Sequence, residues 1–250
     1  MIEITIPANA SNFRGEAGRL RRRALSMAVD REKLARELFH DTVIPANGFV
    51  APLHGTTPPA PTDATALTYQ PEKARELWAK AESMDPFEGT FSIAYNLDGS
   101  HQKWVEAVAQ QMTDTLGVPT EGRPFETFKQ MRQEVTARHI TGAFRTSWQA
   151  EYPDESSFLA PLFASYSAAN ESGFRNATFD DLLEQAGKAA TDAEADEYYK
   201  QAQDLLVDAM PAIPLWTSKS LGAYGKDIIP ACYTWKPLPN YYLIQRSSAR

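Results

Sequence analysis

Apolar side chains recur at helical spacing along much of the chain. Between residues 19 and 39 they fall three or four positions apart, which predicts a helix with a break near Asp30, where a second helical segment begins. Further helices are expected from Pro71 onward, over 101–116 with its end at Gly117, over 126–138, and as a hairpin of 179–190 and 193–209. These segments predict a chain rich in amphipathic helices.

Alternating apolar and polar residues predict strands between several of these helices. The pattern is clear over 91–97, 118–125 and 142–148, and shorter extended pieces are expected at 2–6 and 213–217. The first three strands alternate with helices, an order that implies parallel pairing through right-handed crossovers. We therefore expect an α/β lobe in which helices flank a mixed, mainly parallel sheet.

Three stretches lack a helical or strand period. Residues 40–70 are rich in proline and glycine, and residues 164–178 are small and polar, so both are expected to be long loops. After Ser218 the pattern predicts short strands separated by turns, the last of them at 241–245. Asp98–Ser100 is expected to form a turn that caps the helix over 101–116, and the cluster of arginines at 19–23 is expected to be a solvated face paired with acids.

The composition narrows the classes of function. The net charge of the 250-residue chain is −7, which argues against nucleic acid and anionic lipid as partners. No apolar run reaches the roughly 18–20 residues of a membrane span, and the first six residues do not resemble a signal peptide. The single cysteine, Cys232, forms no intramolecular disulfide and is expected to be a small buried side chain.

Motifs of enzymes and metal sites are missing from the sequence. It contains no G-x-S-x-G elbow, no H-E-x-x-H motif and no glycine-rich phosphate loop. The four histidines are scattered and none stands at a metal-binding spacing from another ligand. We expect a binding protein that is not an enzyme and that holds no metal or cofactor.

Charged and aromatic side chains gather at the end of the predicted strand 142–148. Arg145, Trp148, Glu151 and Tyr152 lie within eight residues, and Asn96 ends a strand that is expected to run parallel to it. Ligands of open α/β sheets bind at such strand ends. The alternative is that Arg145 and Glu151 form an ordinary surface ion pair and that the two aromatic residues only pack.

Four segments resemble one protein family in the order in which that family carries them. Residues 148–163, WQAEYPDESSFLAPLF, resemble the W-x-x-D-Y-P-D-P-x-x-F-L segment of the peptide/nickel/opine class of ABC-transporter solute-binding proteins. Residues 22–32 resemble the family's R-x-A-L-x-x-A-I-D-R-E segment, and residues 174–183 resemble its Y-S-N-P-x-x-D-x-L-L segment. Residues 199–216 resemble its Y-x-x-A-Q-x-x-L-x-x-x-x-P-x-I-P-L-W segment.

The resemblance implies a periplasmic-binding-protein-like type II fold and roles for individual residues. In the oligopeptide-binding proteins the Asp of W-x-x-D-Y pairs with the ligand's α-amino group, and Glu151 stands at that position here. Arg145, three residues before the Trp, would meet the ligand's carboxylate. Glutamate in place of aspartate lengthens the side chain by one methylene, so the ligand could be displaced or could differ from a standard peptide.

The resemblance also implies an organisation and a function. Residues 1–18 would cross from a missing first lobe, residues 19–217 would form the C-terminal lobe, and residues 218–250 would return toward the first lobe. The expected protein is a monomeric, extracytoplasmic component of an ABC importer that binds oligopeptides or dipeptides between two lobes and delivers them to the permease subunits. An anchor on the membrane, as in lipoproteins of the family, would lie in a missing N-terminal segment. A nickel chelate, an opine or an oligosaccharide as ligand, or a protein-interaction module without transport, remain alternatives.

Overall fold

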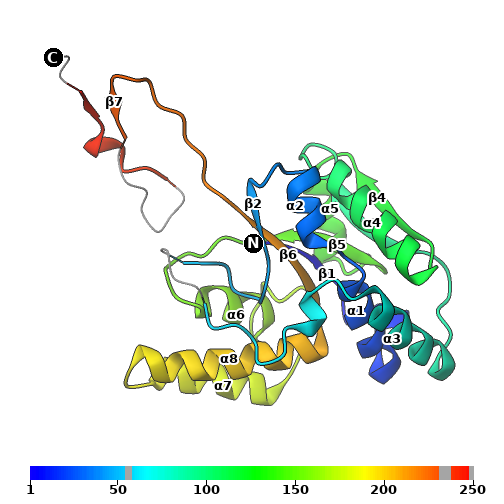
Figure 1. Cartoon of the computed structure of the whole chain (residues 1–250). Helices are drawn as coiled ribbons and strands as arrows, with labels where there is room; N and C mark the ends of the chain where they lie inside the picture. The colour runs from blue at the N-terminus through cyan, green and yellow to red at the C-terminus, as the bar shows by residue number, and fades with distance from the viewer. Residues whose placement is uncertain (54–57, 231–237, 248–250) are drawn as a thin grey trace.

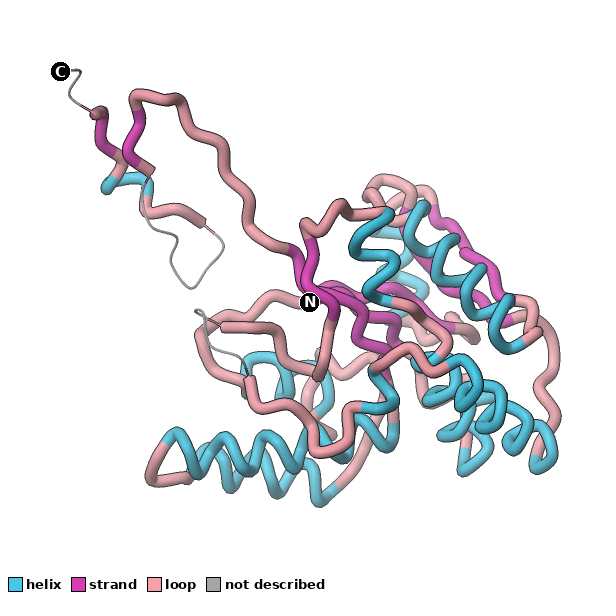
Figure 2. Tube along the Cα trace, in the orientation of Figure 1, coloured by secondary structure: helices cyan, strands magenta, loops and turns pink. Residues whose placement is uncertain are grey.

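A six-stranded sheet forms the centre of the molecule in the computed structural model, which describes residues 1–53, 58–230 and 238–247 (Figures 1 and 2). The strand order is β2-β6-β1-β5-β3-β4. The strands are β1 Ile2–Thr5, β2 Val43–Pro45, β3 Phe91–Asn96, β4 Thr120–Phe125, β5 Ala143–Ser147 and β6 Ala212–Ser218. Five of the six cover segments that were predicted to be extended, and the sixth, β2, lies in the predicted loop 40–70.

The sheet is mixed, as predicted, but less parallel than the alternation of strands and helices implied. Parallel pairing joins β3 to β4 and to β5, the three strands whose order predicted it. Within the described residues, β1 pairs antiparallel with both β5 and β6, and β2 pairs antiparallel with β6. No helix precedes β1, and β2 is only three residues long, so the sequence pattern could not show that they run opposite to their neighbours.

Eight α-helices of the described residues surround this sheet, close to the predicted segments (Figure 1). They are α1 Gly15–Met27, α2 Arg31–Glu37, α3 Pro71–Met84, α4 Gln102–Leu116, α5 Phe128–Thr136, α6 Ser156–Phe163, α7 Ala177–Lys188 and α8 Asp192–Ala209. The break predicted near Asp30 is confirmed, because the Asp30 side chain caps α2 by accepting a hydrogen bond from the main-chain N–H of Lys33 at 2.9 Å. Gly117 ends α4 in the left-handed conformation, with φ of 71°.

The two faces of the sheet are covered by different helices. Ile93 and Ala143 belong to the main core, together with buried residues of α1 and α4. Ala94 and Phe144, the next residues along the same strands, pack in a smaller cluster with Met131 and Val135 of α5. This alternation follows from the period of two in a strand, which sends successive side chains to opposite faces.

Trp216 near the end of β6 occupies the middle of the main core. Its side chain is fully buried, and its ring lies 4.7 Å from that of Phe39 and 5.4 Å from that of Trp104, measured between centroids. Such tilted and edge-on pairs match the quadrupoles of aromatic rings. Strand β6 is therefore held by Trp104 of α4 and by Phe39 in the turn that follows α2.

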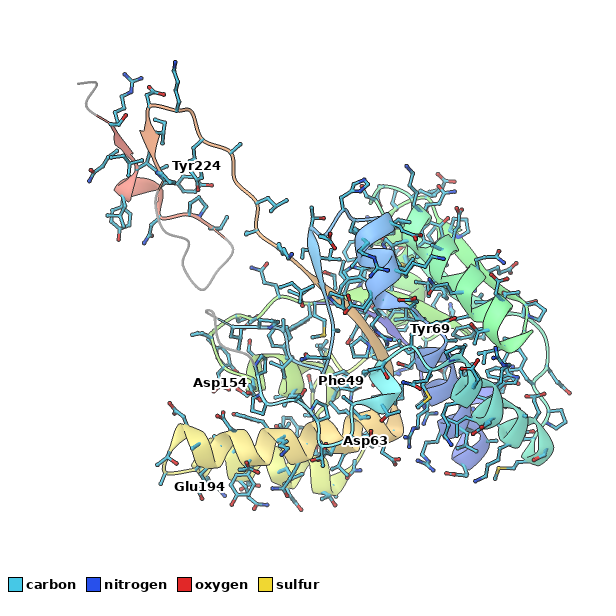
Figure 3. All side chains as sticks on the ribbon, in the orientation of Figure 1. Phe49, Asp63, Tyr69, Asp154, Glu194 and Tyr224 are labelled. Carbon is cyan, nitrogen blue, oxygen red and sulfur yellow. The ribbon has the colours of Figure 1, made fainter. Side chains whose placement is uncertain are left out.

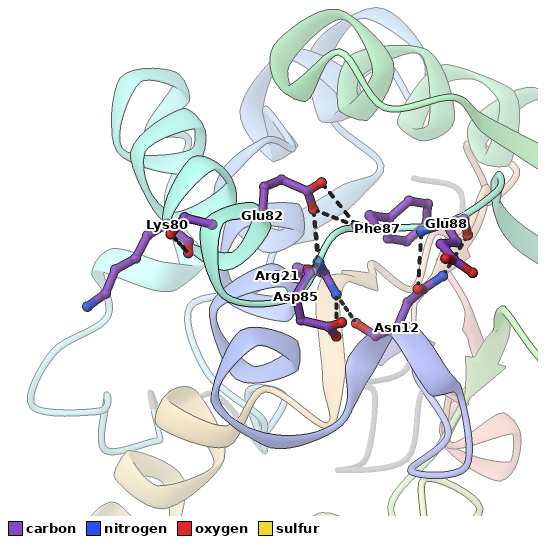
Figure 4. A network of polar contacts seen from close by, with 8 residues as sticks. Asn12, Arg21, Lys80, Glu82, Asp85, Phe87 and Glu88 are labelled. Carbon is purple, nitrogen blue, oxygen red and sulfur yellow. Dashed lines mark hydrogen bonds and ion pairs between the residues drawn. The ribbon is translucent and has the colours of Figure 1, made fainter.

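The arginine cluster of α1 differs from its prediction. Arg21 is fully buried, and its guanidinium bonds to Glu82 at 2.9 Å and to the carbonyl oxygen of Asn12 at 2.8 Å (Figure 4). It also lies over the rings of Trp78 and Phe87. Arg19 and Arg23 do pair with an acid, Asp208, as expected of a polar face. The sequence contains no signal that separates Arg21 from its neighbours, because its partners come from α3, from the loop after α3 and from the turn at 11–13.

A tail leaves this body after β6 and projects away from it (Figure 1). It contains the two-stranded ribbon of β7 Ile228–Ile229 and β8 Gln245–Arg246. The strand predicted at 241–245 is wrong, because Tyr241–Leu243 form a 3₁₀ turn before β8. Cys232 lies outside the described residues. At the other end of the chain, β1 lies between β5 and β6, so residues 2–5 are part of the lobe's own sheet.

Candidate functional site

Asn96 and Arg145 meet at one edge of the sheet. They stand near the carboxyl ends of β3 and β5, which run parallel, so both strands present their last residues on the same side. The Nε of Arg145 donates a hydrogen bond to Oδ1 of Asn96 at 2.9 Å, and both side chains are buried. The structure thus brings together two of the residues that were selected from the sequence.

Phe128 and Asp98 complete the surroundings of Arg145. The guanidinium carbon lies 4.9 Å from the centroid of the Phe128 ring, a cation–π contact. Asp98 accepts hydrogen bonds from the side-chain amide of Asn96 and from the main-chain N–H of Phe128, the latter at 3.0 Å. Asp98 therefore binds the first N–H of α5. The prediction that the Asp98–Ser100 turn caps α4 is wrong, because the N-cap residue of α4 is His101, which makes no side-chain cap bond.

The charge of Arg145 is not neutralised by an ion pair within the described part of the chain. Burial lowers the pKa of Arg145, and the carboxylate of Asp98 opposes that shift. His101 shares this environment: burial, and then the positive charge of Arg145, lower its pKa to about 4. The site therefore contains a desolvated cation whose direct hydrogen-bond partner is the neutral amide of Asn96.

Trp148 lines a pocket of about 270 Å³ beyond the end of β5. The indole N–H donates to the carbonyl oxygen of Ser157 at 2.7 Å, and the main-chain N–H of Trp148 donates to Met1 at 2.9 Å. The ring is thereby fixed in a half-buried position. The walls of the pocket come from five parts of the chain: Met1, Ile2, Ala51, Pro52, Leu53, Ser147, Gln149, Ala150, Phe158, Thr217 and Ser218.

Glu151 and Tyr152 lie on the exposed loop between β5 and α6. The main-chain N–H of Glu151 is bound by Oγ of Ser157 at 2.8 Å, which fixes the backbone and leaves the carboxylate exposed. Tyr152 is 47% exposed, and its hydroxyl lies 3.2 Å from Oγ of Ser156. Arg145 bonds to Asn96, and no described ion pair joins it to Glu151, so the alternative of a surface ion pair between them is not what the structure shows.

Sequence reasoning missed several residues of this region. Phe128 follows the N-cap of α5 and carries no periodic signal, since it is an exposed aromatic residue at the first helical position. The contribution of Met1, Ile2, Thr217 and Ser218 to the pocket depends on β1 pairing with β5 on one side and with β6 on the other, which only the sheet order reveals. Within the described residues no group of histidine, cysteine, aspartate or glutamate is placed to hold a metal ion.

Relatives of the chain are solute-binding proteins. The chain is 30% identical over 217 residues to the glutathione-binding protein GsiB of Escherichia coli O6:K15:H31, which covers 83% of this chain and 41% of the relative. The solved structure of the E. coli murein tripeptide binding protein MppA is 25% identical with a TM-score of 0.73, over 87% of this chain and 42% of that one. This chain therefore spans less than half the length of these relatives.

Two other solved structures extend the comparison. A peptide-binding protein of a peptide ABC transporter is 28% identical with a TM-score of 0.72, and the match covers 86% of this chain and 97% of that one. The OppA of Burkholderia pseudomallei shares the fold with a TM-score of 0.77 at 23% identity, over 94% of this chain and 46% of that one. These matches confirm the predicted periplasmic-binding-protein-like type II fold.

The family itself is shown by its own sequence pattern. The model for "Bacterial extracellular solute-binding proteins, family 5 Middle" matches residues 19–170, a range that contains α1, the sheet edge with Asn96 and Arg145, and the Trp148 loop. This range covers more than half of the chain and includes two of the four segments whose resemblance was noted in the sequence. The chain belongs to the bacterial extracellular solute-binding proteins of family 5.

Proposed function

We propose that this chain forms one lobe of an extracytoplasmic solute-binding protein that binds oligopeptides or dipeptides for an ABC importer. The observation that carries the proposal is the buried cation at the edge of the sheet. Arg145 is 9% exposed, lies over Phe128 and bonds to the neutral Asn96. A desolvated guanidinium that makes no ion pair within the described residues is suited to a ligand carboxylate, which it can bind through charge-assisted hydrogen bonds.

The Trp148 pocket supports the same proposal. It lies beside Ser147, the last residue of β5, and its lining combines apolar side chains such as Phe158 with residues 147–150. A peptide can be held there through its backbone groups without selection of its side chains. Glu151, on the loop that follows, is the residue that we assign to the ligand's ammonium group.

The tail supports a second lobe. Its described part exposes large apolar side chains, including Leu221, Tyr241 and Tyr242, which are 70%, 66% and 82% exposed. Surfaces of this kind are usually covered by another part of a protein. We propose that the tail packs on a first lobe that shares the ligand cleft, and that a closed, ligand-bound form is recognised by the permease subunits.

The location and alternative ligands are also proposals. A periplasmic relative and the extracellular family support an extracytoplasmic location. A monomeric protein is part of the same proposal. In the described residues no helix is long and apolar enough to cross a membrane. An oligosaccharide would stack on Trp148 and would not need Arg145, whereas a peptide needs the charges of both Arg145 and Glu151.

Calorimetric titration of the complete protein with peptides tests the proposal. We expect a free peptide to bind, and Arg145→Gln to weaken its binding by about 2 kcal/mol or more. Amidation of the peptide's C-terminus should weaken binding to the native protein by a similar amount. In the Arg145→Gln variant, amidation should weaken binding little further, because the contact with the carboxylate is already lost. N-acetylation and Glu151→Gln form the equivalent pair at the other end of the peptide.

Arg123 offers a matched control for Arg145. It also lies over an aromatic ring, that of Phe125 at 5.2 Å, but it is exposed on β4. Arg123→Gln should leave peptide affinity unchanged. Equal losses in the two variants, or binding of sugars with no response to peptides, would refute the assignment of Arg145 to a peptide carboxylate.

A further inference from the structure

A second cavity lies between the loop before α6 and the first turns of α8. It has a volume of about 490 Å³ and contains four acidic side chains, Asp154, Glu155, Asp192 and Asp196. Its remaining walls are mostly apolar: Leu53, Pro58, Pro59, Pro153, Ala195 and the ring of Tyr199. Figure 3 shows Asp154 on the side of the molecule where α8 begins, near Glu194. The cavity is therefore an apolar slot with acidic groups around it.

Glu155 distinguishes this cavity from an ordinary acidic surface. Its side chain lines the cavity although the residue is only 8% exposed. One carboxylate oxygen, Oε2, is shielded from solvent and has no hydrogen-bond partner in the described residues. Buried polar groups in native proteins are almost always bonded, so an unbonded carboxylate oxygen indicates a partner that is a ligand.

Among the residues that the structure describes, no positive charge forms an ion pair with this group. The described ion pairs include none of the four acids of the cavity. Burial, and then the charges of Asp196 and Asp154, raise the pKa of Glu155 to about 8. The same environment raises the pKa of Asp196, and it raises that of Tyr199, whose hydroxyl donates to Asp154 at 3.1 Å, to about 12. A cation that entered would relieve this repulsion.

The geometry favours an organic cation. The acids are not clustered closely enough to coordinate a metal ion, as no such group occurs in the described chain. Proline, leucine and alanine side chains on the walls fit a hydrocarbon stem. We propose that this cavity is a binding site for a primary alkylammonium group, with Glu155 as its principal counter-charge and Asp196 at its mouth. The group can belong to a free diamine or to a lysine side chain.

This site is separate from the candidate peptide site. The Trp148 pocket and the acidic cavity share one lining residue, Leu53, but Arg145, Trp148 and Glu151 do not line the cavity. Binding of an amine therefore does not depend on the proposed role of Arg145. The two sites can be tested independently, since variants of Glu155 leave the Trp148 pocket intact.

Calorimetric titration of the whole chain with 1,5-diaminopentane at pH 8.5 is the first test, with 1,5-pentanediol as the uncharged probe of the same length. We expect the diamine to bind and the diol not to bind. Glu155→Gln should weaken diamine binding at least tenfold, and Asp196→Asn several-fold. Glu121→Gln, which removes an exposed carboxylate of β4, is the matched control and should have no effect. Equal affinity in Glu155→Gln, or no diamine binding, would overturn the proposal.

Proton linkage provides a second measurement on the native chain. Because Glu155 is protonated below its raised pKa, amine binding at pH 6.5 should release a proton, which appears as a dependence of the measured heat on the buffer's ionisation enthalpy. Its absence would contradict the role of Glu155 even if a variant failed to fold. Titration with N-acetyl-lysine amide distinguishes the two sources: tighter binding than the diamine assigns the site to lysine side chains, and weaker binding assigns it to free diamines.

Discussion

The body of the molecule, up to Ser218, and its tail, from Lys219 to Ser247, use apolar side chains in opposite ways. In the body, Trp104 and Trp216 are buried to within 2% and pack ring against ring. In the tail, Tyr241 and Tyr242 are more than half exposed. Both regions contain large aromatic side chains. The difference teaches that the body contains its own core, whereas the described part of the tail leaves its apolar side chains exposed.

Replacing one aromatic residue in the body and one in the tail should give the largest difference in stability between the two regions. Trp216→Ala leaves a cavity beside Phe39 and Trp104, so we expect it to lower the free energy of unfolding by about 3–5 kcal/mol. Tyr242→Ala, in the tail, should change it by less than about 0.5 kcal/mol, because the ring is 82% exposed. Urea denaturation followed by circular dichroism measures both. A similar loss in the two variants would show that the tail is part of the core.

A pair of glycines sharpens the contrast at the level of the backbone. A Cβ on Gly18 would lie 2.0 Å from the carbonyl carbon of Phe13, so α1 cannot accept it without moving the turn before the helix. We expect Gly18→Ala to destabilise the chain by about 1–3 kcal/mol despite the better helix propensity of alanine.

Gly225 in the tail is the matched control for Gly18. The nearest atom to its added Cβ is Oδ1 of Asp227 at 3.0 Å, on a side chain that can move away. Gly225→Ala should leave the thermal unfolding midpoint within about one degree of the native value, since it affects less than about 0.2 kcal/mol. A stabilised Gly18→Ala variant would show that the turn at 11–13 adjusts freely.

Removing the whole tail should change the stability of the body only slightly. A chain that ends at Ser218 loses the hydrogen bond that the Lys219 N–H donates to the carbonyl oxygen of Thr42. We expect the free energy of unfolding to change by less than about 1 kcal/mol, with an unchanged dependence on urea, because the tail's surface is already exposed. A decrease of 3 kcal/mol or more would mean that the tail stabilises the body.

Much of the fold could be predicted from the sequence because it is encoded locally. Helical spacing located α4, α7 and α8, and Asp30 and Gly117 marked a helix start and a helix end. Alternation located β3 and β5, and their order in the chain predicted that Asn96 and Arg145 would share an edge. These signals depend on residues close in sequence, where the pattern itself determines the structure.

The remaining features depend on contacts between distant residues. Asp98 caps α5, thirty positions later, and Arg21 is buried because Glu82 reaches it from α3. The directions of β1 and β2, each antiparallel to its neighbouring strands, also depend on partners that are distant in sequence. Of the candidate site residues, the contact between Asn96 and Arg145 is present in the structure, and ligand binding by Arg145, Trp148, Glu151, Tyr152 and Asn96 stays a prediction.

The way in which β6 continues into the tail has a mechanical consequence. The strand is bonded to β1 on one side and to β2 on the other, and the tail extends from its last residue (Figure 1). A pull on the tail along the strand would load the hydrogen bonds on both sides together, in shear, instead of opening them one after another. A force applied to the tail would therefore be carried into the centre of the sheet, beside Thr217, Ser218 and the Trp148 pocket.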